Sequence, residues 1–368
     1  MGKRCFDSDV LVVGGGPAGA AAAIICAKMG LRVRILEGNA STVDKPGETL
    51  HPGVEAVLAQ LGVADRLPAV TGSRHAGIRV RWGDVDRFEA YGQDQEGPWL
   101  GYQVSRVDFE AMLLDRAREV GVEVMQPCVV RDCFRSEERT VCVEGSLGMM
   151  SARTVINASG RSARFSANLG NDRQRHSPPL VARYGYGTGT NPHLDQSPIL
   201  TGNRKGWLWQ AMVRPGLYQW TRVSLDGSRF AQKWRPDEFQ ELTPVGEPKG
   251  ADVTWRLAKN PAQPGWFSVG DAAAVLDPTS ANGVLRALLS GIMAGKLISG
   301  IQSSVVAEEE AVGVYNEWLA NWFFSAANTL QGFYRSLGVA GFSDKIEASA
   351  PTLTAVHQQH DLDALLEN

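Results

Sequence analysis

The chain has 368 residues, of which 43% are hydrophobic and 21% are charged, a balance typical of a soluble globular protein. Its formal net charge of -3 does not favour binding to nucleic acid or to an anionic membrane, and no apolar run in the sequence is long enough to predict a membrane span. The five cysteines are odd in number and lack CxxC spacing, which favours buried thiols over disulfides or a metal site.

The first forty residues predict a strand, a helix and a second strand. Residues 9–13 form an apolar run, small residues from 17 to 29 predict a helix, and "RVRILE" predicts a strand that ends at Glu37. The apolar patch runs directly into glycines, unlike a signal sequence, so a cytoplasmic location is expected. A carboxylate at Glu37 can accept hydrogen bonds from ribose hydroxyls and disfavours a 2′-phosphate, which points to FAD or NAD.

Between the first strand and the helix, Gly14, Gly16 and Gly19 form a G-x-G-x-x-G motif. Gly14 allows a tight turn, Gly16 lets the backbone approach a pyrophosphate, and Gly19 allows close packing of helix and strand. Pro17 and Ala18 begin the helix, whose free N–H groups and positive dipole end favour phosphate.

A second motif lies in "GWFSVGDAAAVLDPTSANGVLRALLSGIMAG", residues 265–295, where a strand at 266–269 leads to Gly270-Asp271 and a helix begins near residue 282. It resembles the second flavin motif of the glutathione-reductase-like flavoproteins of the p-hydroxybenzoate-hydroxylase type. The resemblance implies that the cofactor is FAD and that Asp271 holds its ribityl chain. It further implies that the flavin ring is approached by Pro278, Asn282, Gly283 and Val284.

Two middle segments are similar to other FAD-contacting parts of that family. "YQVSRVDFEAMLLDRAREVGVEV", residues 102–124, implies that Arg106 reaches the FAD, and "RTVINASGRSAR", residues 153–164, implies that Gly160 lies beside it. Val129 is also expected at the cofactor. The Asp-Gly motif of NAD(P)H-using hydroxylases is replaced by Ser159-Gly160, so the electron donor stays open.

The stretch "GETLHP", residues 47–52, resembles the G-E-[ST]-x-x-P loop of flavin-dependent halogenases. The resemblance implies that Glu48, Thr49 and His51 face the flavin. His75 stands where the halogenases carry the lysine that holds hypohalous acid, and Ser280 stands where they carry a glutamate. Both halogenating residues are thus missing, which disfavours chlorination and leaves oxygen chemistry.

Together, "GDAAAVLDPTSANGV" and the GETLHP loop resemble the flavoproteins that mature tryptophylquinone (CTQ) glycine and lysine oxidases. This resemblance implies a monooxygenase that hydroxylates a tryptophan side chain of a precursor protein through a flavin C4a-hydroperoxide. It would use molecular oxygen and an external reductant or reductase. Glu48, His51 and His75 are the candidate catalytic groups, although each histidine could also be purely structural.

Alternating aromatic residues between 176 and 260 predict strands, with a hairpin turn at 201–206. Trp207 and Trp209 could wall a substrate pocket, but core positions are preferred. Residues 308–338 predict a helix with an aromatic face, which either packs on its own domain or, less commonly, receives a partner.

The expected fold class is therefore α/β, with a glutathione-reductase-like FAD-binding Rossmann domain, an inserted mixed β-sheet substrate domain and C-terminal helices. The FAD-binding parts are expected at 1–75, 101–170 and 261–300, the substrate domain at 76–100 and 171–260, and a helical region at 301–368. Alternative functions are a hydroxylase or halogenase-like enzyme for a small aromatic, a reductase of isoprenoid double bonds, and a non-catalytic flavoprotein that chaperones its partner.

Overall fold

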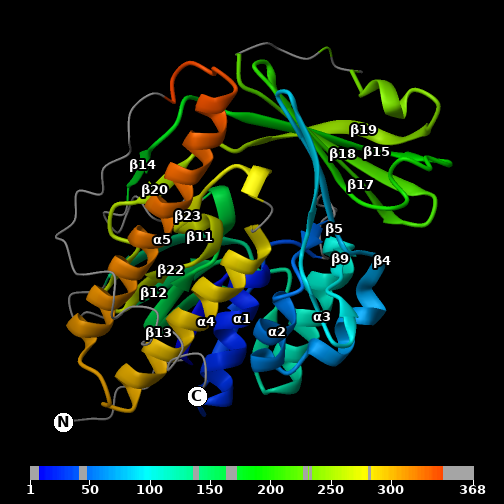
Figure 1. Cartoon of the computed structure of the whole chain (residues 1–368). Helices are drawn as coiled ribbons and strands as arrows, with labels where there is room; N and C mark the ends of the chain where they lie inside the picture. Colours follow the sequence, from blue (N-terminus) through cyan, green and yellow to red (C-terminus); the bar gives the residue numbers. More distant parts are fainter. Residues whose placement is uncertain are drawn as a thin grey trace, which may run out of the picture.

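The computed structural model describes residues 8–40, 48–135, 141–162, 172–226, 231, 234–280 and 283–342. Two β-sheets dominate the chain, with helices between and beside them (Figure 1). The α-helices are α1 (Pro17–Lys28), α2 (Val54–Leu61), α3 (Arg106–Glu119), α4 (Gly283–Gln302) and α5 (Glu308–Ser336).

The first sheet contains five parallel strands in the order β10-β2-β1-β13-β22. These are β1 (Ser8–Val13), β2 (Val33–Leu36), β10 (Glu123–Met125), β13 (Gly148–Asn157) and β22 (Trp266–Ser268). The sheet is extended by antiparallel β11 (Val130–Arg135), β12 (Val141–Gly145) and β21 (Ala262–Gln263). Because the five strands are parallel, their carboxyl ends share one edge, where open α/β sheets bind ligands.

Helix α1 packs between this sheet and α4, and small residues allow the close approach. A Cβ added at Gly291 of α4 would lie 2.2 Å from the Ala18 carbonyl oxygen, so only glycine fits there. Helix α4 has the length and hydropathy of a membrane span, which the sequence did not predict, but 61% of its most apolar window is buried inside the protein. We therefore assign it to the core.

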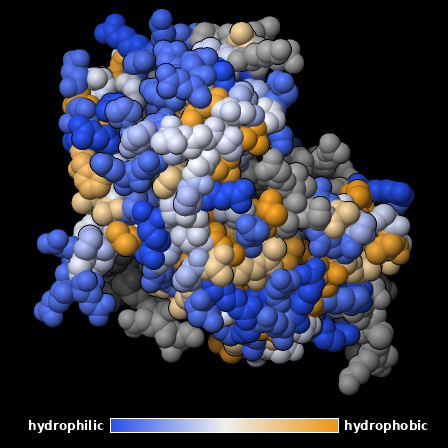
Figure 2. Space-filling model, turned by 90° about the vertical axis from the view of Figure 1, so that its right-hand side faces the viewer, coloured by the Kyte–Doolittle hydropathy of each residue, from blue (hydrophilic) through white to orange (hydrophobic). Residues whose placement is uncertain are grey.

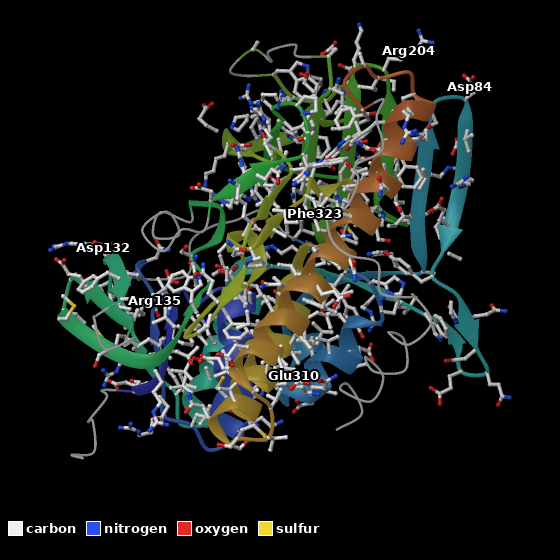
Figure 3. All side chains as sticks on the ribbon, turned by 90° about the vertical axis from the view of Figure 1, so that its left-hand side faces the viewer. Asp84, Asp132, Arg135, Arg204, Glu310 and Phe323 are labelled. Carbon is white, nitrogen blue, oxygen red and sulfur yellow. The ribbon has the colours of Figure 1, made fainter. Side chains whose placement is uncertain are left out.

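The second sheet is mixed and has the order β19-β15-β18-β17-β16-β5-β6, in which only the β16–β5 pair is parallel. Trp207 and Trp220 are buried in its core. Asp84 marks the tip of the β5–β6 hairpin, which lies beside the C-terminal end of α5 (Figure 3), where Trp82 Nε1 donates to the Phe333 carbonyl oxygen at 3.2 Å. The strands are β5 (Gly77–Trp82), β6 (Val85–Ala90), β15 (Val181–Thr188), β16 (Ile199–Asn203), β17 (Gly206–Arg214), β18 (Leu217–Ser224) and β19 (Thr243–Asp252).

Smaller sheets complete the fold. The one that matters for the site has the order β3-β9-β4, formed by β3 (Glu48–Leu50), β9 (Gly101–Val104) and β4 (Thr71–His75). The others are β14 (Arg173–Arg175), β20 (Arg256–Ala258) and β23 (Ala274–Val275), and the pair β7 (Gln93–Asp94) and β8 (Gly97–Pro98). On the face shown in Figure 2, apolar residues are interspersed with polar ones.

The aromatic face of α5 packs on the protein itself, which is the interpretation that the sequence analysis preferred. Tyr315 and Phe323 are fully buried, and Trp318 and Trp322 pack against the same core. The less common interpretation, in which these residues form a partner groove, is therefore wrong. The hairpin predicted at 201–206 is present between β16 and β17.

Candidate active site

The glycine loop joins β1 to α1 as the sequence predicted. Gly14 has a φ of 107°, and a Cβ there would lie 2.4 Å from the Ala158 carbonyl oxygen. A Cβ at Gly19 would lie 2.1 Å from the Gly14 carbonyl oxygen. Both positions are therefore restricted to glycine by the protein itself.

Gly16 differs, because a Cβ built there meets no described atom within 4 Å. It is the N-cap of α1, has extended backbone and lacks a side-chain cap, and Pro17 and Ala18 follow in the first turn. The loop thus leaves open space directly before a helix N-terminus, where backbone N–H groups favour phosphate. This arrangement fits the pyrophosphate of a dinucleotide.

Glu37 follows β2 at the same edge. Its Oε2 accepts a hydrogen bond from Gly15 N at 2.7 Å, and its Oε1 accepts from Asn39 N at 2.9 Å. The carboxylate is held beside the glycine loop, which is the place that a ribose-binding acid requires. Val129, half-exposed and directly before β11, lies beside Gly38.

The carboxyl ends of β13 and β22 meet the glycine loop. Gly270 has a φ of 58°, and a Cβ there would lie 2.9 Å from that of Ala18, so the Gly270-Asp271 turn touches the start of α1. Asp271 Oδ2 accepts a hydrogen bond from Arg161 Nε at 2.9 Å, and Gly160 precedes that arginine with a φ of 69°.

Asn157 is fully buried at the end of β13, next to the glycine loop. Its Oδ1 accepts from the Ser159 hydroxyl at 2.6 Å, whereas its Nδ2 has no hydrogen-bond partner among the described residues. A buried amide donor without a partner is costly, and here it lies at the edge expected to bind the nucleotide. This donor is a second feature that fits a bound dinucleotide.

The other residues expected to contact the cofactor lie in different kinds of position. Arg106 is the first residue of α3, and its guanidinium donates to Glu110 Oε1 at 2.5 Å. Pro278 lies in a short 3-10 turn, Gly283 begins α4, and the Val284 side chain is buried in the core. Asn282 lies outside the described residues, as does the Glu48 side chain, whose backbone is in β3.

Thr49 and His75 are brought together on one face of the β3-β9-β4 sheet. Gln103 lies between them, with its Nε2 2.6 Å from Thr49 Oγ1 and 3.4 Å from His75 Nε2. His75 Nδ1 lies 3.1 Å from the Gly77 carbonyl oxygen. Burial, offset in part by that hydrogen bond, lowers the pKa of His75 to about 4, so this imidazole is neutral near pH 7.

His51 is more exposed and lies on the other side of Tyr91. The Tyr91 ring centroid is 4.9 Å from that of His51 and 5.5 Å from that of His75. Gly53 N donates to His51 Nδ1 at 3.1 Å, so a neutral His51 carries its proton on Nε2. Partial burial lowers the pKa of His51 as well. His51 therefore presents a donor rather than a free basic nitrogen.

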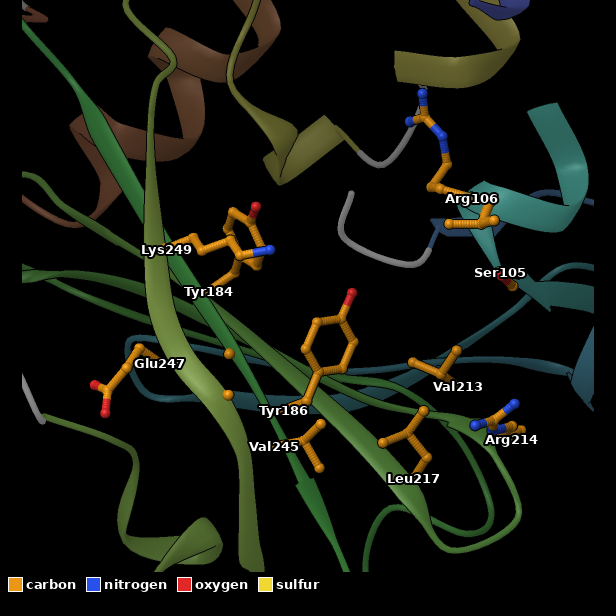
Figure 4. Close-up of a pocket in the computed structure, with 13 residues that line it drawn as sticks. Ser105, Arg106, Tyr184, Tyr186, Val213, Arg214, Leu217, Val245, Glu247 and Lys249 are labelled. Carbon is orange, nitrogen blue, oxygen red and sulfur yellow. The ribbon is translucent and has the colours of Figure 1, made fainter. Parts of the chain in front are cut away.

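A cavity of about 310 Å³ opens between α3 and the second sheet. Figure 4 shows Tyr184, Tyr186 and Lys249 on the sheet side, facing Ser105 and Arg106 at the start of α3. Val213, Arg214, Leu217, Val245 and Glu247 also line it. Trp207, considered as a pocket wall from the sequence, is instead buried and donates to the Tyr334 hydroxyl at 3.1 Å.

Sequence reasoning missed Gln103, Tyr91 and the buried carboxylate of Asp277. Asp277 accepts from Trp255 Nε1 at 2.7 Å, from the Tyr334 hydroxyl at 2.8 Å and from the Thr279 hydroxyl and backbone N–H. The Asp-Pro step of the second flavin motif was the only available signal, since the partners lie up to 57 residues away.

Comparison with known proteins agrees with this geometry. The family model for an FAD binding domain matches residues 7–179. Tryptophan 2-halogenase of Chondromyces crocatus is 26% identical over 89% of this chain and 68% of its own length. A 1H-pyrrole-2-carbonyl-[peptidyl-carrier protein] brominase of Pseudoalteromonas luteoviolacea is 25% identical over 79% of this chain and 77% of its own.

Among solved structures, the flavin-dependent halogenase CmlS superimposes with a TM-score of 0.80 at 22% identity, covering 99% of this chain and 71% of that one. This likeness shows the α/β fold with mixed sheets and C-terminal helices. The glycine cradle, Glu37 and the matched domain agree on the cofactor. The chain therefore carries an FAD-binding domain at residues 7–179 and is similar to flavin-dependent halogenases over most of its length. It is an FAD-dependent oxidoreductase of the monooxygenase type.

Proposed function

We propose that this chain is a monooxygenase that hydroxylates the indole ring of a tryptophan in a partner protein. The partner would be the precursor of a tryptophylquinone amine or amino-acid oxidase, in the cytoplasm. The observation that carries oxygen rather than halogen transfer is His75. By the resemblance it takes the place of the halogenase lysine, yet it is buried, and its pKa of about 4 keeps it neutral. A neutral imidazole cannot replace the ammonium group that holds hypohalous acid.

The cavity supports an aromatic substrate. Its volume of about 310 Å³ and the Tyr184 and Tyr186 rings suit a planar ring system, which aromatic walls bind by offset or edge contacts. It is open to solvent, so a side chain presented by another protein could enter it. Arg214 and Lys249 at its border favour a substrate that carries negative charge nearby.

In this proposal the FAD, once reduced by an external donor, supplies oxygen activated from molecular oxygen. The protein's part is to hold the indole ring and to limit water. Tyr184 and Tyr186 hold the ring from the sheet side, and Arg106 borders the cavity from the FAD-binding side. His51, with its Nε2 proton, can donate a hydrogen bond beside Tyr91, and Glu48 remains a candidate acid or base.

The second candidate is a hydroxylase or halogenase-like enzyme for a small or carrier-bound aromatic. The relatives named above support it, since one is named for tryptophan and another for a pyrrole on a peptidyl-carrier protein. Such an enzyme would turn over its aromatic substrate without a quinone-enzyme precursor.

The deciding experiment is the intact mass of a tryptophylquinone oxidase precursor co-expressed with and without this chain. A gain of oxygen mass on a tryptophan peptide is expected. The matched control is the Gly16→Ala variant, because that residue lies in the proposed FAD cradle and a Cβ added there meets no described atom within 4 Å. An unchanged precursor, with FAD bound and reductant supplied, contradicts the proposal, and oxidation of free tryptophan or indole in the same extract would favour the alternative.

A further inference from the structure

Hydrogen bonds link His75, Gln103 and Thr49, and the donor and the acceptor of each bond can be assigned. The series begins at the Gly77 carbonyl oxygen, which can only accept a hydrogen bond, so His75 Nδ1 must carry a proton. Because burial keeps the ring neutral, His75 Nε2 then carries none and can only accept.

This requirement fixes the Gln103 amide. The atom facing His75 Nε2 must be a donor, so it is the amide nitrogen rather than the oxygen. The same nitrogen lies 2.6 Å from Thr49 Oγ1, so its second N–H donates to the threonine. Gln103 is 2% exposed, so its side-chain amide has little room to flip and exchange the positions of its oxygen and nitrogen.

The orientation of the Gln103 amide determines how the Thr49 hydroxyl can form hydrogen bonds. Its oxygen already accepts from Gln103, so its single proton is directed elsewhere, and none of the described residues accepts it. Thr49 belongs to the GETLHP loop, and it is 7% exposed. A nearly buried hydroxyl proton without an acceptor in the described protein suggests that its acceptor is a bound group.

We propose that His75 and Gln103 are positioning residues that hold the Thr49 hydroxyl as a hydrogen-bond donor to the FAD. The donor would favour the reduced, more negatively charged flavin over the oxidised one. The proposal concerns the cofactor alone and stands whichever aromatic substrate the enzyme oxidises. It also gives a defined role to His75, which the resemblance aligns with the halogenase lysine.

The glycine at position 101 supports this arrangement. It is the β9 residue paired with His75, and a Cβ there would lie 2.9 Å from His75 Cε1 and 2.6 Å from Tyr91 Cε2. The sheet therefore leaves out a side chain where the imidazole and Tyr91 come together. His75 is seated by packing as well as by its hydrogen bonds.

The test uses the whole 368-residue chain and FAD, without any substrate. The dissociation constants of oxidised and reduced FAD are measured anaerobically, and their ratio reports the preference of the site. Thr49→Val is expected to weaken the binding of reduced FAD about tenfold more than that of oxidised FAD, as for loss of a hydrogen bond to a charged group. Thr49→Ser keeps the hydroxyl and is expected to keep the ratio.

The positioning role is tested by combining substitutions. Gln103→Leu is expected to shift the ratio in the same direction as Thr49→Val, and to add nothing when Thr49 is already valine. His75→Leu allows the Gln103 amide to flip and is expected to shift the ratio as Gln103→Leu does. His176→Leu is the control, because His176 takes no part in these hydrogen bonds, and it is expected to leave the ratio unchanged. If Gln103→Leu fails to fold, Gln103→Met replaces it.

Two results overturn the proposal. If Thr49→Val leaves the ratio unchanged while FAD still binds, the hydroxyl does not donate to the flavin. If Gln103→Leu shifts the ratio equally with threonine or valine at position 49, Gln103 does not act through Thr49. Neither result bears on the precursor experiment, so the two proposals fail separately.

Discussion

At the scale of single residues, the three glycines of the loop, Gly14, Gly16 and Gly19, have different roles. Gly14 and Gly19 are limited by protein atoms, whereas the space beside Gly16 is open. A methyl group at Gly16 therefore meets no described protein atom within 4 Å but intrudes on the space assigned to the pyrophosphate. This difference separates a folding role from a binding role.

We predict that Gly16→Ala, at the N-cap of α1, lowers the stability of the apoprotein by no more than about 1 kcal/mol. It is expected to weaken FAD binding about tenfold or more, where tenfold equals about 1.4 kcal/mol. Gly332→Ala is the control, because Gly332 is an exposed helical glycine of α5 with open space around it. The control is expected to bind FAD normally and to gain about 0.5–1 kcal/mol of stability. Thermal melts and FAD fluorescence titration check both, and equal FAD affinity in the two variants would remove Gly16 from the cradle.

His75 predicts how stability depends on pH. Its pKa is about 4 in the folded protein against an ordinary value of 6.5, so the unfolded chain binds this proton more readily. The free energy of unfolding is therefore highest, as far as His75 is concerned, above pH 6.5. It falls as the pH drops through 6.5 towards 4, by up to about 3 kcal/mol in total. Urea unfolding at several pH values should show a shallower acid decline for His75→Asn, and an unchanged decline for the exposed control His193→Asn.

At the scale of elements, α5 is tied to the second flavin motif by one buried group. The Tyr334 hydroxyl donates to Asp277 Oδ2, lies 2.8 Å from the Thr279 hydroxyl and accepts from Trp207 Nε1. Burial raises the pKa of Asp277, which its several donors oppose. The helix thereby fixes the turn at Pro278 that leads into α4.

A pair of tyrosine-to-phenylalanine variants in α5 tests this tie. Tyr334→Phe removes a donor from a buried carboxylate and is expected to lower the free energy of unfolding by about 2–3 kcal/mol. Tyr315→Phe removes a bond of 2.7 Å to the Ser268 carbonyl oxygen, a neutral acceptor, and is expected to cost about 1 kcal/mol. Denaturant unfolding measures both, and equal losses would mean that Asp277 gains little from Tyr334.

At the scale of the whole molecule, sequence reasoning predicted what depends on neighbouring residues. The glycine loop, the ends of β1 and α1, and the Gly270-Asp271 turn were predictable because local backbone demands select glycine there. The contacts of Gln103 were not, because they follow from strand pairing across 54 residues. The cavity was missed for the same reason, since it is lined by α3 and four strands of the second sheet.

The position of the cavity between the two parts of the molecule leads to a last prediction. Tyr186 stands on the sheet side, whereas the FAD cradle lies at the carboxyl ends of the parallel strands, so substrate and cofactor affinity should separate. Tyr186→Ala removes an aromatic wall and is expected to weaken the binding of a tryptophan-containing peptide about two- to tenfold, given about 0.5–1.5 kcal/mol for an aromatic pair. Tyr186→Phe keeps the ring and should bind the peptide nearly as the unmodified protein does. Calorimetry on the FAD-loaded protein measures the peptide, flavin absorbance measures the loading, and a loss of FAD in Tyr186→Ala would show that this wall supports the cofactor instead.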